Sequence, residues 1–165
     1  MEINTGSTRM YGLLVLYDMQ TTYFKNVLEG ISDKDAHERL GTRANHVAWL
    51  TGSLVQQRYE LANMLGVGGQ QAAHELFENY QGIQGGINYP PLAGFKKDWG
   101  SISPLLREAL VKATDETLNR NFEMGQATMT YFDLIAFCTY REANCIGQIA
   151  LYRRLLGYEA MKYDD

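Results

Sequence analysis

Apolar residues recur at intervals of three and four positions along four long stretches of the chain. These stretches cover residues 10–28, 43–65, 92–110 and 131–156. Such spacing places apolar side chains along one face of an α-helix. Glycines follow three of the stretches at Gly30, Gly66 and Gly157, and Thr130 precedes the last, as expected of helix ends and helix starts. The pattern predicts an all-α fold, and no run of alternating residues is long enough to predict a strand.

Shorter elements are expected between the long helices. Ser32 and Asp35 predict a capped turn of helix that continues through Leu40. Residues 71–80 predict another short helix, within a long connection between the second and third long helices. Pro104 falls inside the third helix, where it predicts either a kink or a break. Four long helices with one long crossover and short accessory helices predict a four-helix bundle.

Length and charge narrow the class of protein. With 165 residues the chain has the size of one domain, and we predict a single domain over residues 1–165. Its net charge of -4 and its lack of an extended basic patch argue against a nucleic-acid partner. The apolar runs fall far short of the roughly 20 residues that span a membrane, and the first residues lack a signal-peptide pattern. We therefore expect no membrane partner and a soluble, cytoplasmic protein.

Several segments resemble the DinB/YfiT-like superfamily. Residues 140–157 read Y-R-E-A-N-C-I-G-Q-I-A-L-Y-R-R-L-L-G, and the last helix of that family reads H-E-A-x-H-x-G-Q. Residues 45–54, N-H-V-A-W-L-T-G-S-L, resemble its second helix, commonly N-x-x-x-W-x-x-G-H-L. Residues 89–92, Y-P-P-L, together with Trp99 and Ile102, resemble the start of its third helix. The resemblance extends over essentially the whole chain and implies an up-down-down-up four-helix bundle that forms a homodimer.

The resemblance also implies where a metal would bind. Many members of the family hold a divalent metal on three histidines, and those positions fall on Ser53, Arg141 and Cys145 in this chain. A protonated serine hydroxyl is a poor ligand, and a guanidinium has no free lone pair and repels a cation. We therefore expect no metal and no other cofactor.

Three residues near these positions keep alternative interpretations. His46 is either a helix cap or core residue, or a base or ligand in a pocket beside Cys145. Cys145 is either a small buried side chain or a nucleophile whose pKa is lowered by Arg141. Arg141 either forms a salt bridge with a carboxylate such as Asp18 or Glu60, or grips the anionic group of a ligand.

Other residues of the last helix are expected to pack. Cys138 continues the face that carries Cys145 and is expected in the core. Gly147 is expected to let another helix approach closely, and Gln148 to form a hydrogen bond with a neighbouring helix.

Three functional hypotheses follow. The first is a metal-free bundle that binds a small anionic ligand between its helices. The expected cavity residues are His46, Trp49, Ser53, Arg141, Cys145 and Gln148. The second is a thiol-dependent S-transferase or hydrolase-like enzyme, with Cys145 and His46 as catalytic candidates and either a divalent metal such as zinc or nickel or a low-molecular-weight thiol as cofactor. The third is a dimeric structural or interaction protein whose cavity is filled by its own side chains.

Overall fold

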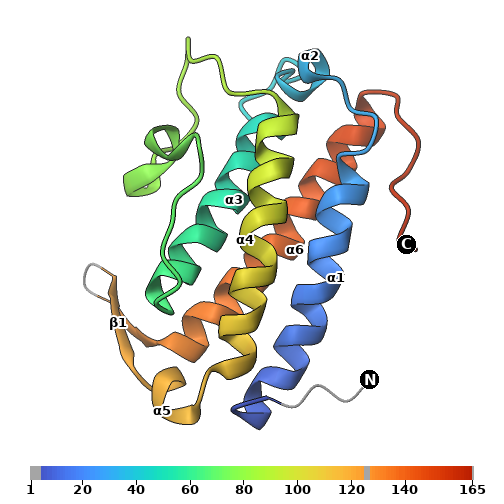
Figure 1. Cartoon of the computed structure of the whole chain (residues 1–165). Helices are drawn as coiled ribbons and strands as arrows, with labels where there is room; N and C mark the ends of the chain where they lie inside the picture. Colours follow the sequence, from blue (N-terminus) through green and yellow to red (C-terminus); the bar gives the residue numbers. More distant parts are fainter. Residues whose placement is uncertain (1–4, 125–126, 165) are drawn as a thin grey trace.

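Four long helices lie side by side in the computed structural model, which describes residues 5–124 and 127–164 (Figure 1). Within these residues the fold class is all-α, as predicted, and the only β structure is a two-stranded antiparallel sheet. In chain order the elements are η1 (Thr8–Met10), α1 (Tyr11–Val27), α2 (Asp33–Ala36), α3 (Val47–Met64), η2 (His74–Leu76), η3 (Glu78–Tyr80), α4 (Leu92–Lys112), α5 (Asp115–Leu118), β1 (Asn121–Met124), β2 (Ala127–Thr130) and α6 (Tyr131–Leu155).

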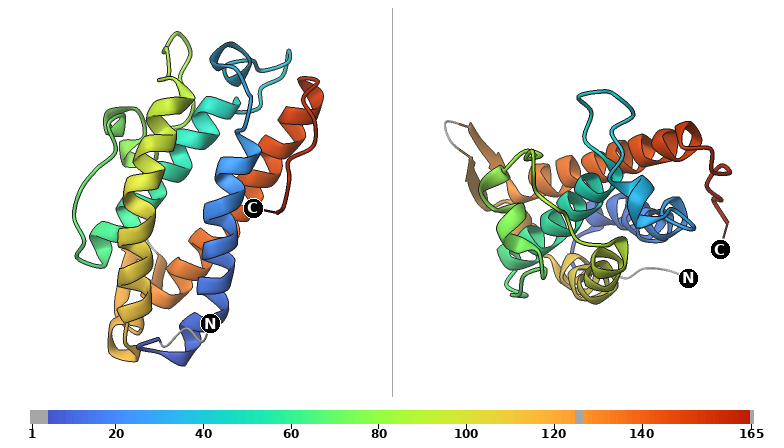
Figure 2. Two further views of the ribbon diagram at one scale, coloured as in Figure 1. Left: turned by 45° about the vertical axis from the view of Figure 1, so that its right-hand side comes forward. Right: turned by 90° about the horizontal axis from the view of Figure 1, so that it is seen from above.

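The first and last long helices run in one direction and the two middle ones run in the other (Figures 1 and 2). At their amino-terminal ends, the Arg9 guanidinium just before α1 lies 4.1 Å from the centre of the Phe132 ring on α6. Further along, the Gln20 side chain on α1 donates to the carbonyl of Thr139 on α6 at 2.9 Å. Because both contacts advance in the same sense, α1 and α6 are parallel neighbours.

Because α3 and α4 also run in the same direction, the connection between them returns along the length of the bundle. This crossover, residues 65–91, is fixed to α3 by Gln71, whose Nε2 donates to the Gly52 carbonyl at 3.1 Å and to Gln56 Oε1 at 2.9 Å. The ring of Phe77 lies against Gly52, where an added Cβ would come within 2.2 Å of it. The crossover therefore forms part of the packed structure and covers one side of α3.

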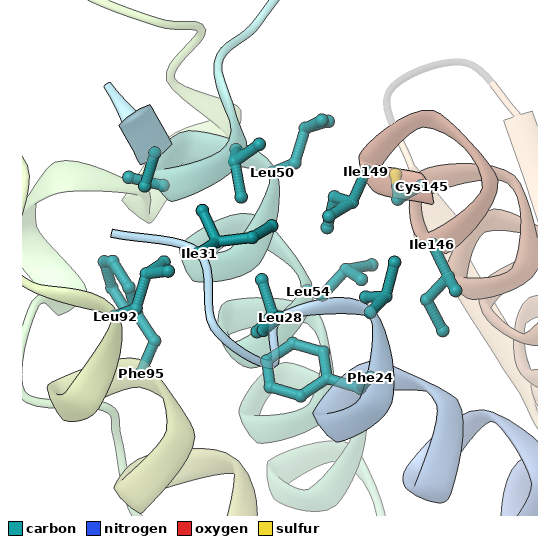
Figure 3. Close-up of a cluster of buried hydrophobic side chains, with 14 of the residues drawn as sticks. Phe24, Leu28, Ile31, Leu50, Leu54, Leu92, Phe95, Cys145, Ile146 and Ile149 are labelled. Carbon is teal, nitrogen blue, oxygen red and sulfur yellow. The ribbon is translucent and has the colours of Figure 1, made fainter. Parts of the chain in front are cut away.

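The core consists of two clusters of buried side chains, one toward each end of the bundle. In the cluster next to α2, the rings of Phe24 and Trp99 stack with their centres 3.8 Å apart. Figure 3 shows part of this cluster, in which Cys145 and Ile149 of α6 lie among apolar side chains of the other long helices. Burial of these apolar faces is the main force holding the helices together.

A buried polar network lies among the four long helices. Arg58 on α3 is fully buried and forms a two-pronged ion pair with Glu142 on α6, with both N–O distances at 2.8 Å. The same guanidinium donates to the hydroxyl of Thr21 on α1 at 2.8 Å and to that of Ser103 on α4 at 2.7 Å. One side chain from each long helix therefore meets at this point, which fixes the register of all four.

The ends of the long helices agree with the predicted signals. The Thr130 hydroxyl accepts the backbone N–H of Asp133, and the Asp133 carboxylate accepts the Thr130 backbone N–H, which completes a capping box for α6. Gly157 follows α6 with a φ of +89°, and Gly66 follows α3 with a φ of +84°. A left-handed backbone of this kind closes a helix and favours glycine.

Several predictions for the short elements, and the predicted start of α3, were wrong. The turn that Ser32 caps ends at Ala36 and does not continue to Leu40, and α3 begins at Val47, four residues later than predicted. Two separate 3-10 turns on either side of Phe77 replace the helix predicted over residues 71–80, and Asn79 and Tyr80 in the second turn adopt left-handed backbone angles. The strands β1 and β2, which pair Phe122 with Met129, were not predicted.

Pro104 does not break α4. The helix is continuous from Leu92 to Lys112 with the proline inside it, so the predicted break is wrong. The buried residues Ile102 and Leu106 lie on either side of the proline and pack in the core. Their burial offsets the backbone hydrogen bond that proline cannot form. Across the described residues, no helix combines the length and apolar character needed to cross a membrane.

Candidate functional site

The antiparallel packing of α3 and α6 brings Arg141 against two polar side chains of α3. Its Nη2 donates to Ser53 Oγ at 2.6 Å, and its Nη1 donates to Gln57 Oε1 at 2.9 Å. Gln57 is itself held, because its Nε2 donates to the carbonyl of Cys138 at 3.1 Å. Ser53 and Gln57 are one helical turn apart, so they present their oxygens side by side to one guanidinium. Arg141 is therefore fixed in position by neutral groups.

Arg141 lies in the wall of a cavity of about 390 Å³. The lining is mostly apolar and comes from α3, the crossover, β1 and α6. It comprises Trp49, Ser53, Gln56, Gln57, Glu60, Leu61, Met64, Phe77, Tyr80, Gln81, Phe122, Leu134, Phe137, Cys138 and Arg141. Five of these residues are aromatic, and Arg141 is the only cation among them. The cavity therefore combines a mostly apolar interior with one cation, Arg141, and one carboxylate, Glu60, which accepts a hydrogen bond from Gln56.

The predicted salt bridge between Arg141 and Asp18 or Glu60 is wrong. Among the described residues, Arg141 takes part in none of the ion pairs. Asp18 pairs with Arg107 at 2.7 Å, and Glu60 accepts a hydrogen bond from Gln56 at 2.9 Å. The charge of Arg141 is thus left without a carboxylate partner on the part of the chain that the structure describes.

Cys145 lies in the core. Its side chain belongs to the cluster shown in Figure 3, and burial raises its thiol pKa despite the opposing effect of Arg141. The hypothesis that Arg141 lowers this pKa below its ordinary value is therefore wrong in direction. Cys138 does line the cavity, but burial raises its pKa to about 12. Both thiols are therefore held in the protonated form, which is not nucleophilic.

His46 caps α3. Its Nδ1 accepts the backbone N–H of Trp49 at 3.0 Å, and its ring lies 5.2 Å from that of Tyr89 and 5.3 Å from that of His37, measured between ring centres. Burial, followed by the charge of His37, lowers the His46 pKa to about 4. The interpretation as a capping residue is confirmed. His46 is not among the residues that line the cavity.

Gln148 faces away from the cavity. Its side chain is exposed and donates to Asn144 of the same helix at 2.7 Å, so the predicted hydrogen bond to a neighbouring helix is wrong. An added Cβ on Gly147 would meet nothing within 4 Å, so this glycine does not permit a close contact within the chain. Gly52 instead permits a close contact, because an added Cβ there would meet the rings of Phe77 and Phe95.

The structure thus brings together three of the six predicted cavity residues, Trp49, Ser53 and Arg141. Sequence reasoning missed the aromatic side chains that complete the lining, among them Phe77 and Phe122. Phe77 is on the crossover and Phe122 is on β1, and no local pattern connects either to α3 or α6. Gln57 could have been found, because it is a polar residue one turn after Ser53 on the same apolar stripe.

The residues at the implied metal positions do not fit a metal. Ser53 and Arg141 are hydrogen-bonded to each other, and Cys145 is in the core with its thiol pKa raised. Over residues 5–124 and 127–164, no three His, Cys, Asp or Glu side chains gather in a way that could hold a metal ion. A guanidinium cannot coordinate a cation, so no chemistry is assigned to a metal here.

Comparison of the chain with protein-family models found no match, and comparison with curated proteins found none either. The relationship to the DinB/YfiT-like superfamily therefore stays a prediction from the quoted segments.

Proposed function

We propose that this protein is a metal-free binding protein for small organic anions, with Arg141 as the residue that holds the anionic group. One observation carries the proposal. A guanidinium is fixed by neutral partners in the wall of an apolar cavity of about 390 Å³, and no carboxylate pairs with it among the described residues.

The unpaired charge favours an anion as ligand. Guanidinium carries five N–H donors, of which Arg141 directs one at Ser53 and one at Gln57. A carboxylate on the ligand would accept from the remaining donors and neutralise a charge that is partly removed from water. Hydrogen bonds to charged groups contribute about 1.5–3 kcal/mol each. Because Arg141 is already fixed, little side-chain entropy is lost when the ligand binds.

The lining favours a flat, apolar ligand body. Trp49, Phe77 and Phe137 contribute rings from three separate segments, and aromatic side chains pack well against a planar ring system. The cavity volume falls within the range of about 300–1,000 Å³ that is typical of small-molecule sites. The proposed ligand class is therefore an aromatic or similarly apolar carboxylate.

The fold expected from the resemblance belongs to the same proposal. The direction of the helices, with α1 and α6 opposite to α3 and α4, supports a DinB/YfiT-like bundle. So does the contact between Ser53 and Arg141, two positions that the resemblance assigns to one site. The raised thiol pKa values give no support to the thiol-transferase alternative, and the open cavity gives none to the scaffold alternative.

A matched pair of ligands tests the proposal. We would titrate the protein with 2-naphthoate and with its neutral analogue 2-naphthamide by isothermal calorimetry. The carboxylate should bind about 10- to 100-fold more tightly than the amide, because only the carboxylate forms charged hydrogen bonds with Arg141. The substitution Arg141→Gln should remove this difference.

Arg43→Gln is the control, because Arg43 is an exposed cation outside the cavity lining. It should leave both affinities unchanged. The proposal is wrong if neither compound binds, if both bind equally to the wild-type protein, or if Arg43→Gln has the same effect as Arg141→Gln.

A further inference from the structure

A carboxylate shares the cavity wall with Arg141. Glu60 on α3 and Arg141 on α6 are the two charged residues of the lining, and their opposite charges leave it with no net charge. A ligand that carries only a negative group would be attracted by Arg141 and repelled by Glu60. The lining therefore favours a ligand that adds a positive group to the negative one.

Glu60 is held in place by a chain of buried amides. Gln71 on the crossover is buried and donates to the Gly52 carbonyl and to Gln56 Oε1. Because Gln56 Oε1 accepts this bond, the Nε2 of the same amide is turned toward Glu60 and donates to its Oε1 at 2.9 Å. Gln56 is also buried. The packing of the crossover on α3 thus sets the position of the Glu60 carboxylate.

Neither charge of the lining is neutralised by the protein. Arg141 and Glu60 are both held by neutral side chains. Over the part of the chain that the structure describes, no ion pair includes either residue, so the two do not pair with each other. Each of them therefore keeps its charge for a group on the ligand.

The two charges are about one helical turn apart. Arg141 donates to Gln57, and Glu60 comes three positions after Gln57 on α3. Side chains three positions apart on a helix are neighbours, with about 5–6 Å between their Cβ atoms. Burial, followed by the charge of Glu142, raises the pKa of the Cys138 thiol to about 12. Arg141 opposes this shift and Glu60 adds to it, so both charges lie near that thiol.

Glu60 lies where the cavity meets solvent. Glu60 and Tyr80 are exposed residues of the lining, whereas Arg141 is half-buried. A carboxylate bound at Arg141 would thus be deeper in the cavity than a cation bound at Glu60. Near the opening the cation keeps part of its hydration, which limits the cost of removing it from water.

We propose that the ligand of this cavity is an aromatic zwitterion, with a carboxylate that binds Arg141 and an ammonium group that binds Glu60. Aromatic α-amino acids have this chemistry, because both charged groups are attached to one carbon atom and can reach partners about one helical turn apart. The proposal rests on the function proposed above, since it keeps the role of Arg141 and adds a second group to the ligand.

Three compounds with the same indole ring test the proposal. L-Tryptophan carries both charges at pH 7, indole-3-propionate lacks the ammonium group, and tryptamine lacks the carboxylate. Isothermal calorimetry should show that the wild-type protein binds L-tryptophan about 3- to 10-fold more tightly than indole-3-propionate. The ammonium group forms an ion pair with Glu60 and offsets the repulsion between that residue and the ligand carboxylate.

Glu60→Gln should remove this preference. L-Tryptophan should bind the variant about 3- to 10-fold more weakly, whereas indole-3-propionate should bind at least as tightly as before, because the repulsion is gone. A role of Glu60 in folding alone would weaken both compounds alike. Glu116→Gln is the control, because Glu116 is an exposed carboxylate on α5 outside the lining, and it should leave the preference unchanged.

Arg141→Gln separates this proposal from the one on which it rests. It should weaken the binding of L-tryptophan and indole-3-propionate but not that of tryptamine. If 2-naphthoate binds through Arg141 while L-tryptophan is not preferred over indole-3-propionate, or if Glu60→Gln leaves the preference intact, the zwitterion is wrong and the anion site stands. If the binding of no carboxylate depends on Arg141, both proposals are wrong.

Discussion

At the scale of single residues, Arg58 has the most demanding environment in the bundle. Its guanidinium lies 3.4 Å from the centre of the Trp99 ring and 4.0 Å from that of Tyr17, with Glu142 paired to it at its edge. Burying a cation is strongly unfavourable unless charge and hydrogen bonds compensate it. Glu142 supplies the charge, and the two rings supply favourable cation–π contacts. The same burial raises the pKa of Tyr17, which therefore stays neutral.

Removing one partner of this ion pair should be costly. We expect Glu142→Gln to lower the free energy of unfolding by about 3–5 kcal/mol, because it leaves the Arg58 charge buried without a counter-charge. Urea denaturation of the wild type and the variant measures this loss. The double variant Arg58→Met/Glu142→Met should lose less, since it leaves no buried charge. If the double variant is the less stable of the two, the ion pair itself is the stabilising element.

His46 should make the stability of α3 depend on pH. Its pKa is lowered from 6.5 to about 4 in the folded protein, first by burial and then by the charges of His37 and Arg39. The folded state therefore favours the neutral ring, which accepts the Trp49 N–H. That stability is fully present above pH 6.5 and is lost as the pH falls toward 4, by about 1–3 kcal/mol.

Urea denaturation at pH 7.5, 5.5 and 4.5 measures this effect. The control is His46→Asn, because asparagine caps a helix well and does not titrate in this range. Its stability should change less over the same interval. An equal pH dependence in both proteins would assign the effect to other groups.

The candidate site could be predicted only in part at this scale. Ser53 and Arg141 could be predicted because the resemblance to the DinB/YfiT-like superfamily assigns both positions to one site. The buried pair of Arg58 and Glu142 was not predicted, because a charged residue inside a helical stripe gives no sign of its partner on another helix. Of the two interpretations of Cys145, the small buried side chain is confirmed and the thiol with a lowered pKa is wrong, because its burial among all four helices outweighs the effect of Arg141.

At the scale of elements, Gly52 decides how the crossover packs. An added Cβ there would lie 2.2 Å from the Phe77 ring and 2.7 Å from Phe95. Gly52→Ala should lower the free energy of unfolding by about 1 kcal/mol or more, since overpacking costs about 1–3 kcal/mol and exceeds the gain in helix propensity. Gly100→Ala is the matched control on α4, where an added Cβ meets nothing.

Thermal unfolding of the two variants measures the contrast. Gly100→Ala should be as stable as the wild type or more stable by up to about 1 kcal/mol, because alanine favours a helix. Gly52→Ala should in addition alter the cavity, since Phe77 is part of its lining. If both variants gain stability, the crossover moves freely enough to accommodate the methyl group.

The long helices were predictable and the short elements were not, for one physical reason. A helix such as α4 repeats its apolar spacing over 21 residues, which makes the signal strong. The strands β1 and β2 have four residues each, too few for an alternating pattern to be recognised. The 3-10 turns η2 and η3 depend on Gln71 and Phe77 packing against α3, a contact between segments that are distant in the sequence.

At the scale of the whole molecule, the cavity belongs to no single helix. Its lining comes from α3, the crossover, β1 and α6, so it forms only when these segments are packed together. The buried network around Arg58 fixes the register of the long helices, and that register places Arg141 against Ser53. The position of the proposed anion site is therefore set by a part of the core that no ligand would touch.

Phe137 lines the cavity, and its side chain is also 51% exposed. A ligand that packs against this ring would therefore cover apolar surface that otherwise contacts water. Filling the proposed site would thus make the outside of the protein less apolar as well as occupying its interior.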